Sequence, residues 1–146
     1  MCTAISYLAH RHYFGRTLDL EHTYRETVTI TPRRFPLPYR RLPTNPSHFA
    51  IIGMATVLEG YPLYYDATNE HGLSMAGLNF VGNAVYHAPT DDKINVTHFE
   101  LIPYLLGICR SVAEARRELE QICITDQAFR EDLPPRAAPL ADCGQA

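Results

Sequence analysis

Short runs of β-branched and aromatic residues, separated by turn-forming residues, fill roughly the first eighty positions of the chain. Runs of this kind are typical of strands. Glu59-Gly60 and Asn69-Glu70-His71-Gly72 lie between runs and suit hairpin connections, because Gly and Asn tolerate positive φ. The pattern therefore predicts a sheet, with strands at Thr3–Leu8, Tyr13–Leu20, Glu26–Thr31, Ala50–Leu58, Leu63–Ala67 and Leu73–Leu78.

The pattern changes to helical spacing after Asn95. Thr97-His98-Phe99-Glu100 matches a capping box and precedes an apolar run through Ile108, which predicts a helix. Pro103 is expected to kink that helix or to delay its regular start. A second capping box, Ser111–Glu114, opens an amphipathic helix over Val112–Ile122. Strands followed by helices indicate an α+β fold.

Two stretches lack periodicity. The segment from Pro32 to Pro46 holds five prolines and four arginines, too interrupted for a regular ladder. We expect a surface loop there, and a solvated connector is favoured over a substrate-facing lid. The end of the chain, Pro134–Ala146, is expected to be a disordered tail.

Composition narrows the class of protein. The chain has 146 residues, 46% hydrophobic and 20% charged, which fits one globular domain, and its net charge of -3 disfavours nucleic-acid and anionic-membrane partners. The cysteines show no CxxC pair, and no apolar run reaches the length of about 20 residues that a membrane helix needs. We expect a soluble, cytoplasmic protein with the cysteines Cys2, Cys109, Cys123 and Cys143 reduced.

Cys2 is the first candidate for catalysis, because it follows the initiator Met1. Removal of that methionine leaves a thiol and an α-amino group on one residue. An α-amine titrates near ~7.7–8.0, so it can act as the base that activates an adjacent nucleophile. Position alone is weak support, since any protein can carry a cysteine there.

Arg16, Asp19 and Asn79 are further candidates on neighbouring predicted strands. A guanidinium near a sulfur favours thiolate, and a carboxylate can orient an ammonium group. An ordinary surface salt bridge explains Arg16 and Asp19 equally well. Asn79 ends an apolar strand and can donate to an oxyanion or satisfy a turn. The His10-Arg11-His12 pair of imidazoles lacks a third ligand, so we expect no metal site.

Several blocks of sequence together resemble the choloylglycine hydrolase family, which includes bile salt hydrolases and penicillin V acylases. They are Met1-Cys2-Thr3, Tyr13-Phe14-Gly15-Arg16 with Leu18-Asp19, Asn69–Leu73 and Ala76–Phe80. The resemblance runs from Met1 to about Pro135. It implies an N-terminal-nucleophile hydrolase fold, an αββα sandwich of antiparallel sheets that is incomplete in this chain. It implies no metal or organic cofactor.

The resemblance also implies roles for individual residues. Cys2 would be nucleophile and base, Arg16 and Asp19 its supports, and Asn79 an oxyanion-hole donor. The Asn at position 79 is similar to bile salt hydrolases, whereas penicillin V acylases often carry Tyr there. The favoured function is hydrolysis of glycine- or taurine-conjugated bile salts; penicillin V acylase and a noncatalytic bile-acid-binding or interaction fragment are the alternatives. Residues expected to line the steroid pocket, although most would be core by composition, are Leu18, Leu20, Tyr24, Met54, Leu58, Tyr64 and Tyr65.

The chain departs from the family in length. Members are much longer, are expected to be homo-oligomeric, and contribute an Asn and an Arg from their second half to the active site. One choice of synonymous codons for Ala138–Ala146, read one base further on, encodes Leu-His-Trp-Leu-Ile-Ala-Asp-Lys, a stretch of the type that the family carries here. We therefore expect a family domain over residues 1–135 and an out-of-frame tail over 136–146. Missing strands predict unpaired edges, aggregation and impaired activity.

Overall fold

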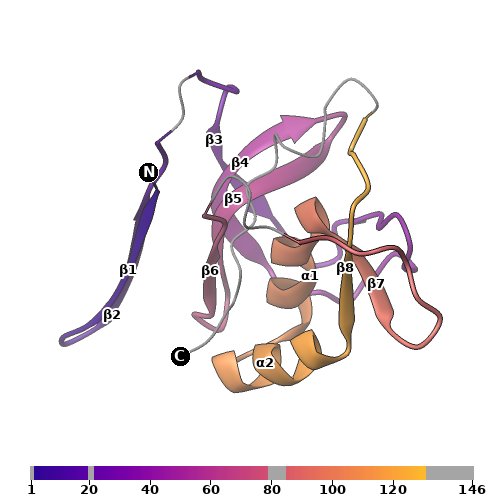
Figure 1. The fold of residues 1–146 in the computed structure, drawn as a ribbon. Helices are drawn as coiled ribbons and strands as arrows, with labels where there is room; N and C mark the ends of the chain where they lie inside the picture. Colours follow the sequence, from indigo (N-terminus) through magenta and orange to yellow (C-terminus); the bar gives the residue numbers. More distant parts are fainter. Residues whose placement is uncertain (1, 20–21, 79–84, 131–146) are drawn as a thin grey trace.

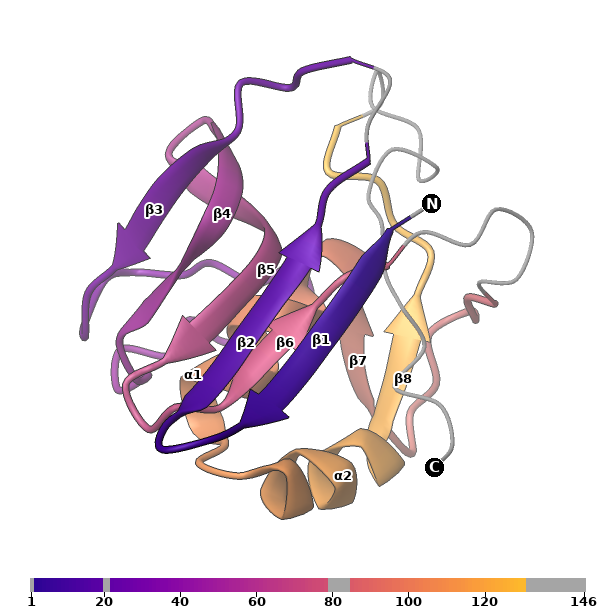
Figure 2. The same cartoon turned by 90° about the vertical axis from the view of Figure 1, so that its left-hand side faces the viewer.

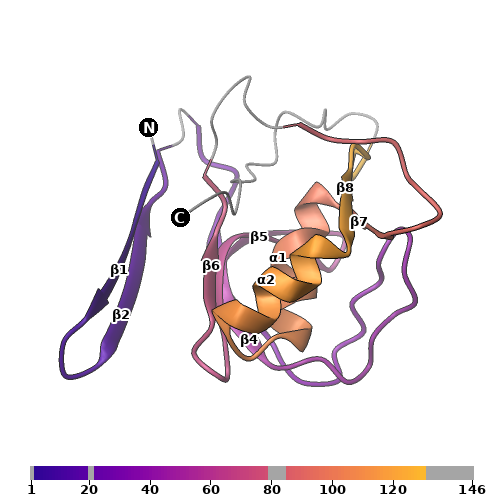
Figure 3. The same ribbon diagram turned by 60° about the horizontal axis from the view of Figure 1, so that its bottom comes forward.

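A four-stranded antiparallel sheet lies at the centre of the computed structural model, which describes residues 2–19, 22–78 and 85–130 (Figure 1). Its strands follow the order β3-β4-β5-β6. A β1–β2 hairpin lies on one side of this sheet and helices α1 and α2 lie on the other (Figures 1 and 3). The strands of the sheet and hairpin are β1 Thr3–Leu8, β2 His12–Thr17, β3 Thr27–Thr31, β4 Ile51–Leu58, β5 Tyr61–Asn69 and β6 Ser74–Ala76.

All six predicted strands are present: β1 has the predicted bounds, and the other five differ by one to three residues at one or both ends, the predicted end Leu20 lying outside the described residues. The two predicted hairpin connections join β4 to β5 and β5 to β6. Gly60 and Gly72 have φ of 78° and 83°, which glycine adopts without steric cost. The α+β prediction is confirmed.

The main core lies between the sheet and α1 (Leu101–Ile108). The α1 side chains Leu101, Ile102, Leu105 and Leu106 are fully buried and pack against residues of β4 and β5. Gly53, in β4, permits β5 to approach closely, since a Cβ at this position would lie 2.0 Å from the Asp66 carbonyl oxygen. Packing against α1 therefore fixes one face of the sheet and leaves the other face toward the hairpin.

The proline-rich segment is irregular, as predicted, but parts of it are buried. Leu37 is fully buried, and the Phe35 carbonyl oxygen lies 2.7 Å from Nε2 of the buried His48, just beyond the segment. The Arg40 backbone N–H donates to Glu100 at 2.7 Å. The Arg40 guanidinium lies 5.6 Å and 5.0 Å from the ring centroids of Phe99 and Phe129, and donates to the Phe129 carbonyl. The segment is therefore a surface loop, as expected, but it is anchored to the rest of the fold through Leu37 and Arg40.

The predicted helical half differs most from the structure. The Thr97–Glu100 capping box opens a 3-10 turn over His98–Glu100, and α1 begins only at Leu101 with Pro103 in its first turn, which confirms the delayed start. Helix α2 (Val112–Glu120) ends before the predicted Ile122. Residues on both sides of the helices form a parallel pair that the sequence pattern did not predict: β7 (Ile94–Thr97) and β8 (Ile122–Thr125).

The hairpin is largely exposed, with every residue of β1 exposed. In the described ranges β1 and β2 pair only with each other (Figure 2). Ile5, Tyr7 and Tyr13 share its outer face and are 63%, 59% and 58% exposed. Tyr7 and Tyr13 are direct cross-strand partners. The hairpin thus presents an apolar outer face, while its inner face lies toward the central sheet.

None of the helices in the part of the chain that the structure describes is long and apolar enough to span a membrane.

Candidate active site

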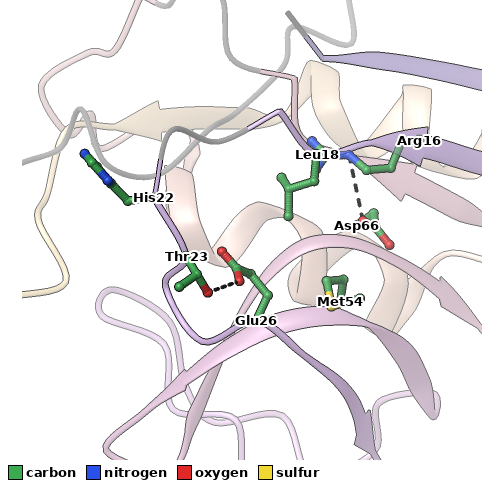
Figure 4. Close-up of a pocket in the computed structure, with 7 residues that line it drawn as sticks. All are labelled: Arg16, Leu18, His22, Thr23, Glu26, Met54 and Asp66. Carbon is green, nitrogen blue, oxygen red and sulfur yellow. Dashed lines mark hydrogen bonds and ion pairs between the residues drawn. The ribbon is translucent and has the colours of Figure 1, made fainter.

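An open cavity of about 600 Å³ lies between the hairpin and the central sheet. Arg16 comes from β2 and Leu18 follows it; Met54 lies on β4 and Asp66 on β5 (Figure 4). The remaining wall comes from the segment before β3, with the lining residues His22, Thr23 and Glu26. The cavity therefore combines apolar walls with charged groups of both signs.

Cys2 precedes β1 by one residue and is not among the residues that line the cavity, but the alternation of the hairpin, continued to Cys2, puts it on the face that carries Arg16. Thr3 pairs with Thr17 and Ala4 pairs with Arg16. Because side chains alternate along a strand, Cys2 shares one face of the hairpin with Arg16 and Leu18, both of which line the cavity. Diagonal neighbours across a strand pair lie within reach of a long side chain. The half-buried Cys2 thiol is thus on the same face as a permanent positive charge.

The Arg16 side chain is only 4% exposed. Its Nη2 donates to the Gly77 carbonyl, and its Nε lies 3.8 Å from Asp66 Oδ2. Within the described ranges, Nε and Nη1 have no hydrogen-bond partner. Burial raises the pKa of the Asp66 carboxyl, and the nearby Arg16 opposes that rise. Arg16 is therefore a buried charge that reaches from the hairpin to the sheet and not a surface salt-bridge partner.

A short chain of hydrogen bonds links Asp19 to the start of β1. The Thr3 backbone N–H donates to Thr17 Oγ1 at 3.0 Å, and that hydroxyl donates to Asp19 Oδ2 at 3.4 Å. Since Thr3 follows Cys2 directly, these contacts hold the Asp19 carboxylate near the backbone that follows Cys2. The arrangement suits the orientation of an ammonium group beside the thiol.

The segment before β3 is held by Glu26. Its carboxylate accepts from the Thr23 hydroxyl and from the Tyr24 backbone N–H, each at 2.8 Å. Backbone donors, Tyr24 first, together with the Thr23 hydroxyl lower the pKa of Glu26. Arg25, which lies between Tyr24 and Glu26, has φ of 60°, an uncommon conformation for a residue other than glycine. This turn shapes the cavity wall opposite Arg16 (Figure 4).

The predicted lining residues have different positions. Leu18 and Met54 line the cavity. Tyr65 is buried and its hydroxyl shares a hydrogen bond with Thr56, at 3.0 Å. Tyr64 packs in the core with α1, on the other face of the sheet. The structure places Tyr24 half-exposed on the segment before β3 and Leu58 at the end of β4, and Leu20 and Asn79 lie outside the described residues.

Sequence reasoning missed four lining residues, of which Asp66 carries a detectable signal. Asp66 is the one acid in the otherwise apolar run Leu63–Ala67. A carboxylate in a strand of that kind is costly to bury unless it has a partner. The other three belong to a short polar segment whose place beside the cavity follows only from the fold: His22, Thr23 and Glu26. In the described ranges no three His, Cys, Asp or Glu side chains gather as metal ligands would.

Comparison with known proteins extends over nearly the whole chain. Residues 2–140 match the family of linear amide C-N hydrolases described as the choloylglycine hydrolase family. A bile salt hydrolase/transferase of Lactiplantibacillus plantarum is 50% identical over 134 residues, which are 92% of this chain and 41% of that protein. A conjugated bile acid hydrolase of Lactobacillus gasseri is 37% identical over 143 residues, 96% of this chain and 45% of that protein.

Solved structures agree with these sequence matches. A cysteine-to-alanine mutant of the conjugated bile acid hydrolase from Clostridium perfringens superposes with a TM-score of 0.84 at 28% identity, over 92% of this chain and 42% of that one. An arginine-to-leucine variant of the same enzyme gives a TM-score of 0.77 at 28% identity, over 84% of this chain and 38% of that one. The predicted N-terminal-nucleophile hydrolase fold is confirmed for this part of the domain.

The chain spans less than half the length of these relatives. The match nevertheless covers the hairpin, the central sheet and both helices. The chain therefore belongs to the choloylglycine hydrolase family of linear amide C–N hydrolases.

Proposed function

We propose that the domain to which this chain belongs hydrolyses the amide bond of glycine- or taurine-conjugated bile salts, with Cys2 as its N-terminal nucleophile. The observation that carries the proposal is the strand alternation of the hairpin: continued one residue beyond β1, it assigns Cys2 to the face of the buried Arg16, which lines an open cavity. Family membership and the names of the bile salt hydrolase relatives support the substrate class.

In the proposed mechanism, removal of Met1 frees the α-amine of Cys2, which accepts the thiol proton. The thiolate attacks the amide carbon and forms a tetrahedral oxyanion. The C–N bond breaks, and glycine or taurine leaves with the proton from the α-ammonium. Water, deprotonated by the α-amine, then attacks the thioester, which releases the bile acid and restores the thiol. Covalent catalysis in this way divides one difficult step into two.

The other residues support those steps. The Arg16 guanidinium is proposed to support Cys2 with its positive charge, and Asp19, which accepts a hydrogen bond from Thr17, is proposed to orient the α-ammonium. Asn79 is proposed as an oxyanion donor, an interaction whose loss typically costs ~10²–10³ in rate. Leu18 and Met54 supply apolar contact for the steroid.

We further propose that residues 1–135 are the N-terminal portion of the domain, that residues 136–146 are an out-of-frame tail, and that the 146-residue chain alone turns over little or no substrate. Its span of 41% to 45% of the curated relatives supports that view, because clamps and oxyanion donors from the remainder would be missing. Sequencing of the downstream gene tests the tail: a continuous family-like reading frame in another phase is expected, and its absence would exclude the frameshift.

The experiment that tests the function uses this chain and a chimera. The chimera joins residues 1–135 to the second half of the Lactiplantibacillus plantarum relative, which is 50% identical over the shared part. Intact mass is expected to show loss of Met1. The chimera is expected to release glycine or taurine from conjugated bile salts. Cys2→Ala should abolish release, whereas Cys123→Ala, a buried cysteine of β8, should retain it.

The alternatives give different results in the same assay. Release of phenoxyacetate from penicillin V in preference to bile-salt cleavage indicates a penicillin V acylase. Folded chimera with neither activity supports a noncatalytic binding fragment. Retention of Met1 together with full activity after Cys2→Ala would refute the proposed nucleophile.

A further inference from the structure

A β-bulge in β5 turns Asp66 toward the hairpin. The pairing of β4 with β5 shifts at Met54/Ala55, so Tyr65 is the extra residue in β5. Tyr64 and Ala67 pack in the core with α1, although they are three residues apart. Tyr65 and Asp66, between them, therefore both lie on the opposite face. Bulges beside active sites commonly redirect a side chain in this way.

The same bulge also positions a second contact to Arg16. The Tyr65 carbonyl accepts a hydrogen bond from the Gly77 backbone N–H at 2.8 Å, and the Gly77 carbonyl accepts from Arg16 Nη2. Asp66, the next residue in β5, lies 3.8 Å from Arg16 Nε. Tyr65 and Asp66, which are consecutive in β5, thus position both groups that contact the guanidinium: the Gly77 carbonyl and the Asp66 carboxylate.

Arg16 has donor capacity left over. Its side chain is 4% exposed, and Nε and Nη1 lack hydrogen-bond partners among the described residues. Burying a guanidinium whose N–H groups lack partners costs folding free energy. Such a group is therefore more often kept for a function than for stability. Asp66 is 22% exposed at its side chain and faces the guanidinium across the cavity wall (Figure 4). The carboxylate therefore holds the charge in place without using its donors.

We propose that Asp66 is a positioning residue, which holds the Arg16 guanidinium on the cavity side of the hairpin so that its charge and unused N–H groups face the Cys2 thiol. This inference rests on the proposed role of Cys2. It assigns a function to the bulge in β5 and to an acid that does not itself touch the reacting atoms.

The direction in which Cys2 reactivity changes when the Asp66 charge is removed distinguishes a positioning role from a direct electrostatic effect on the thiol. A carboxylate near a thiol disfavours thiolate, so removing the Asp66 charge alone would make Cys2 more reactive. If Asp66 acts through Arg16, its removal releases the guanidinium and makes Cys2 less reactive. The two explanations thus predict opposite changes.

The experiment measures the rate at which iodoacetamide alkylates Cys2 at pH 7, followed by mass spectrometry of the N-terminal peptide of the 146-residue chain. Asp66→Asn is expected to lower the rate roughly three- to tenfold. Asp66→Glu, which retains the charge, is expected to keep at least about half of the wild-type rate. Asp92→Asn removes one charge from an exposed turn and is the control, with an unchanged rate expected.

A double-mutant cycle with Arg16→Gln completes the test. Asp66→Asn should have no additional effect when Arg16 is already glutamine. A rate that rises in Asp66→Asn, or falls equally with and without Arg16, overturns the positioning role. If Arg16→Gln itself leaves Cys2 unchanged, the support that the proposed function assigns to Arg16 fails instead, so the two failures are distinguishable.

Circular dichroism shows whether each variant folds. Where Asp66→Asn does not fold, solvent exchange of the Arg16 Nε–H in the wild-type chain, measured by NMR, replaces it. A held guanidinium should exchange at least roughly tenfold more slowly than that of Arg25, on the exposed turn before β3. Equal exchange at the two arginines overturns the proposal.

Discussion

Replacement of Gly53 by alanine should destabilise the chain strongly, because the strands approach too closely there for any side chain. A Cβ at this position would lie 2.0 Å from the Asp66 carbonyl oxygen and 2.6 Å from Ala67 Cα. Both are backbone atoms of the central strand β5, which cannot move without disturbing its pairing with β4 and β6. Overpacking typically costs about 1–3 kcal/mol, and the rigidity of this contact places Gly53→Ala at about 3 kcal/mol.

Thermal unfolding followed by circular dichroism measures this effect. For a chain of this size, about 3 kcal/mol corresponds to a fall in Tm of roughly 10 °C. Gly15→Ala is the matched control, since its Cβ would meet only Ile5 Cγ2, at 4.0 Å, an ordinary contact. That variant should melt within about 2 °C of the wild type, as its cost is within the range of neutral substitutions. Equal Tm values for the two variants would refute the argument from close strand approach.

Three further outcomes follow from charges and exposure. Hydrogen bonds from Arg33 and from a backbone N–H lower the pKa of Glu70 to about 2, so its stabilisation is complete above pH 4.5 and lost toward pH 2; urea unfolding should show the deficit of Glu70→Gln shrinking over that interval, and a constant deficit would contradict it. Burial raises the pKa of Glu100 above its usual 4.5, so wild-type stability should fall relative to Glu100→Gln as pH rises above 4.5, and parallel pH profiles would count against this. Tyr7→Lys should reduce self-association measured by light scattering, whereas Val112→Lys, at an equally exposed position on α2, should not; equal effects would exclude the hairpin face as the cause.

The strands of the sheet could be predicted because their signals are local. Alternating and β-branched runs, with Gly60 and Gly72 at the turns, identify β4, β5 and β6 without any knowledge of the fold. The parallel strands β7 and β8 could not be found in the same way. Each has only four residues, and Ile122–Thr125 is too short for its period to distinguish a strand from the end of a helix.

The site was predictable only in part for a similar reason. Cys2 and Arg16 were found from their position and from family blocks, and the alternation of the hairpin, continued one residue beyond β1, assigns them to one face. Asp66 depends on a bulge, and strict alternation from Tyr64 would have assigned Asp66 to the core face. A register shift arises from pairing between strands, so a single-strand pattern does not contain it.

The contact of Arg40 with Phe129 has a consequence for synthesis on the ribosome. The guanidinium donates to a carbonyl 89 residues later in the chain, at 3.1 Å. At a typical translation rate of 5–20 residues per second, Phe129 is added to the chain roughly 4 to 18 seconds after Arg40. The strands from β3 to β6 are complete long before then. The nascent chain can therefore assemble its central sheet first and attach the proline-rich segment last.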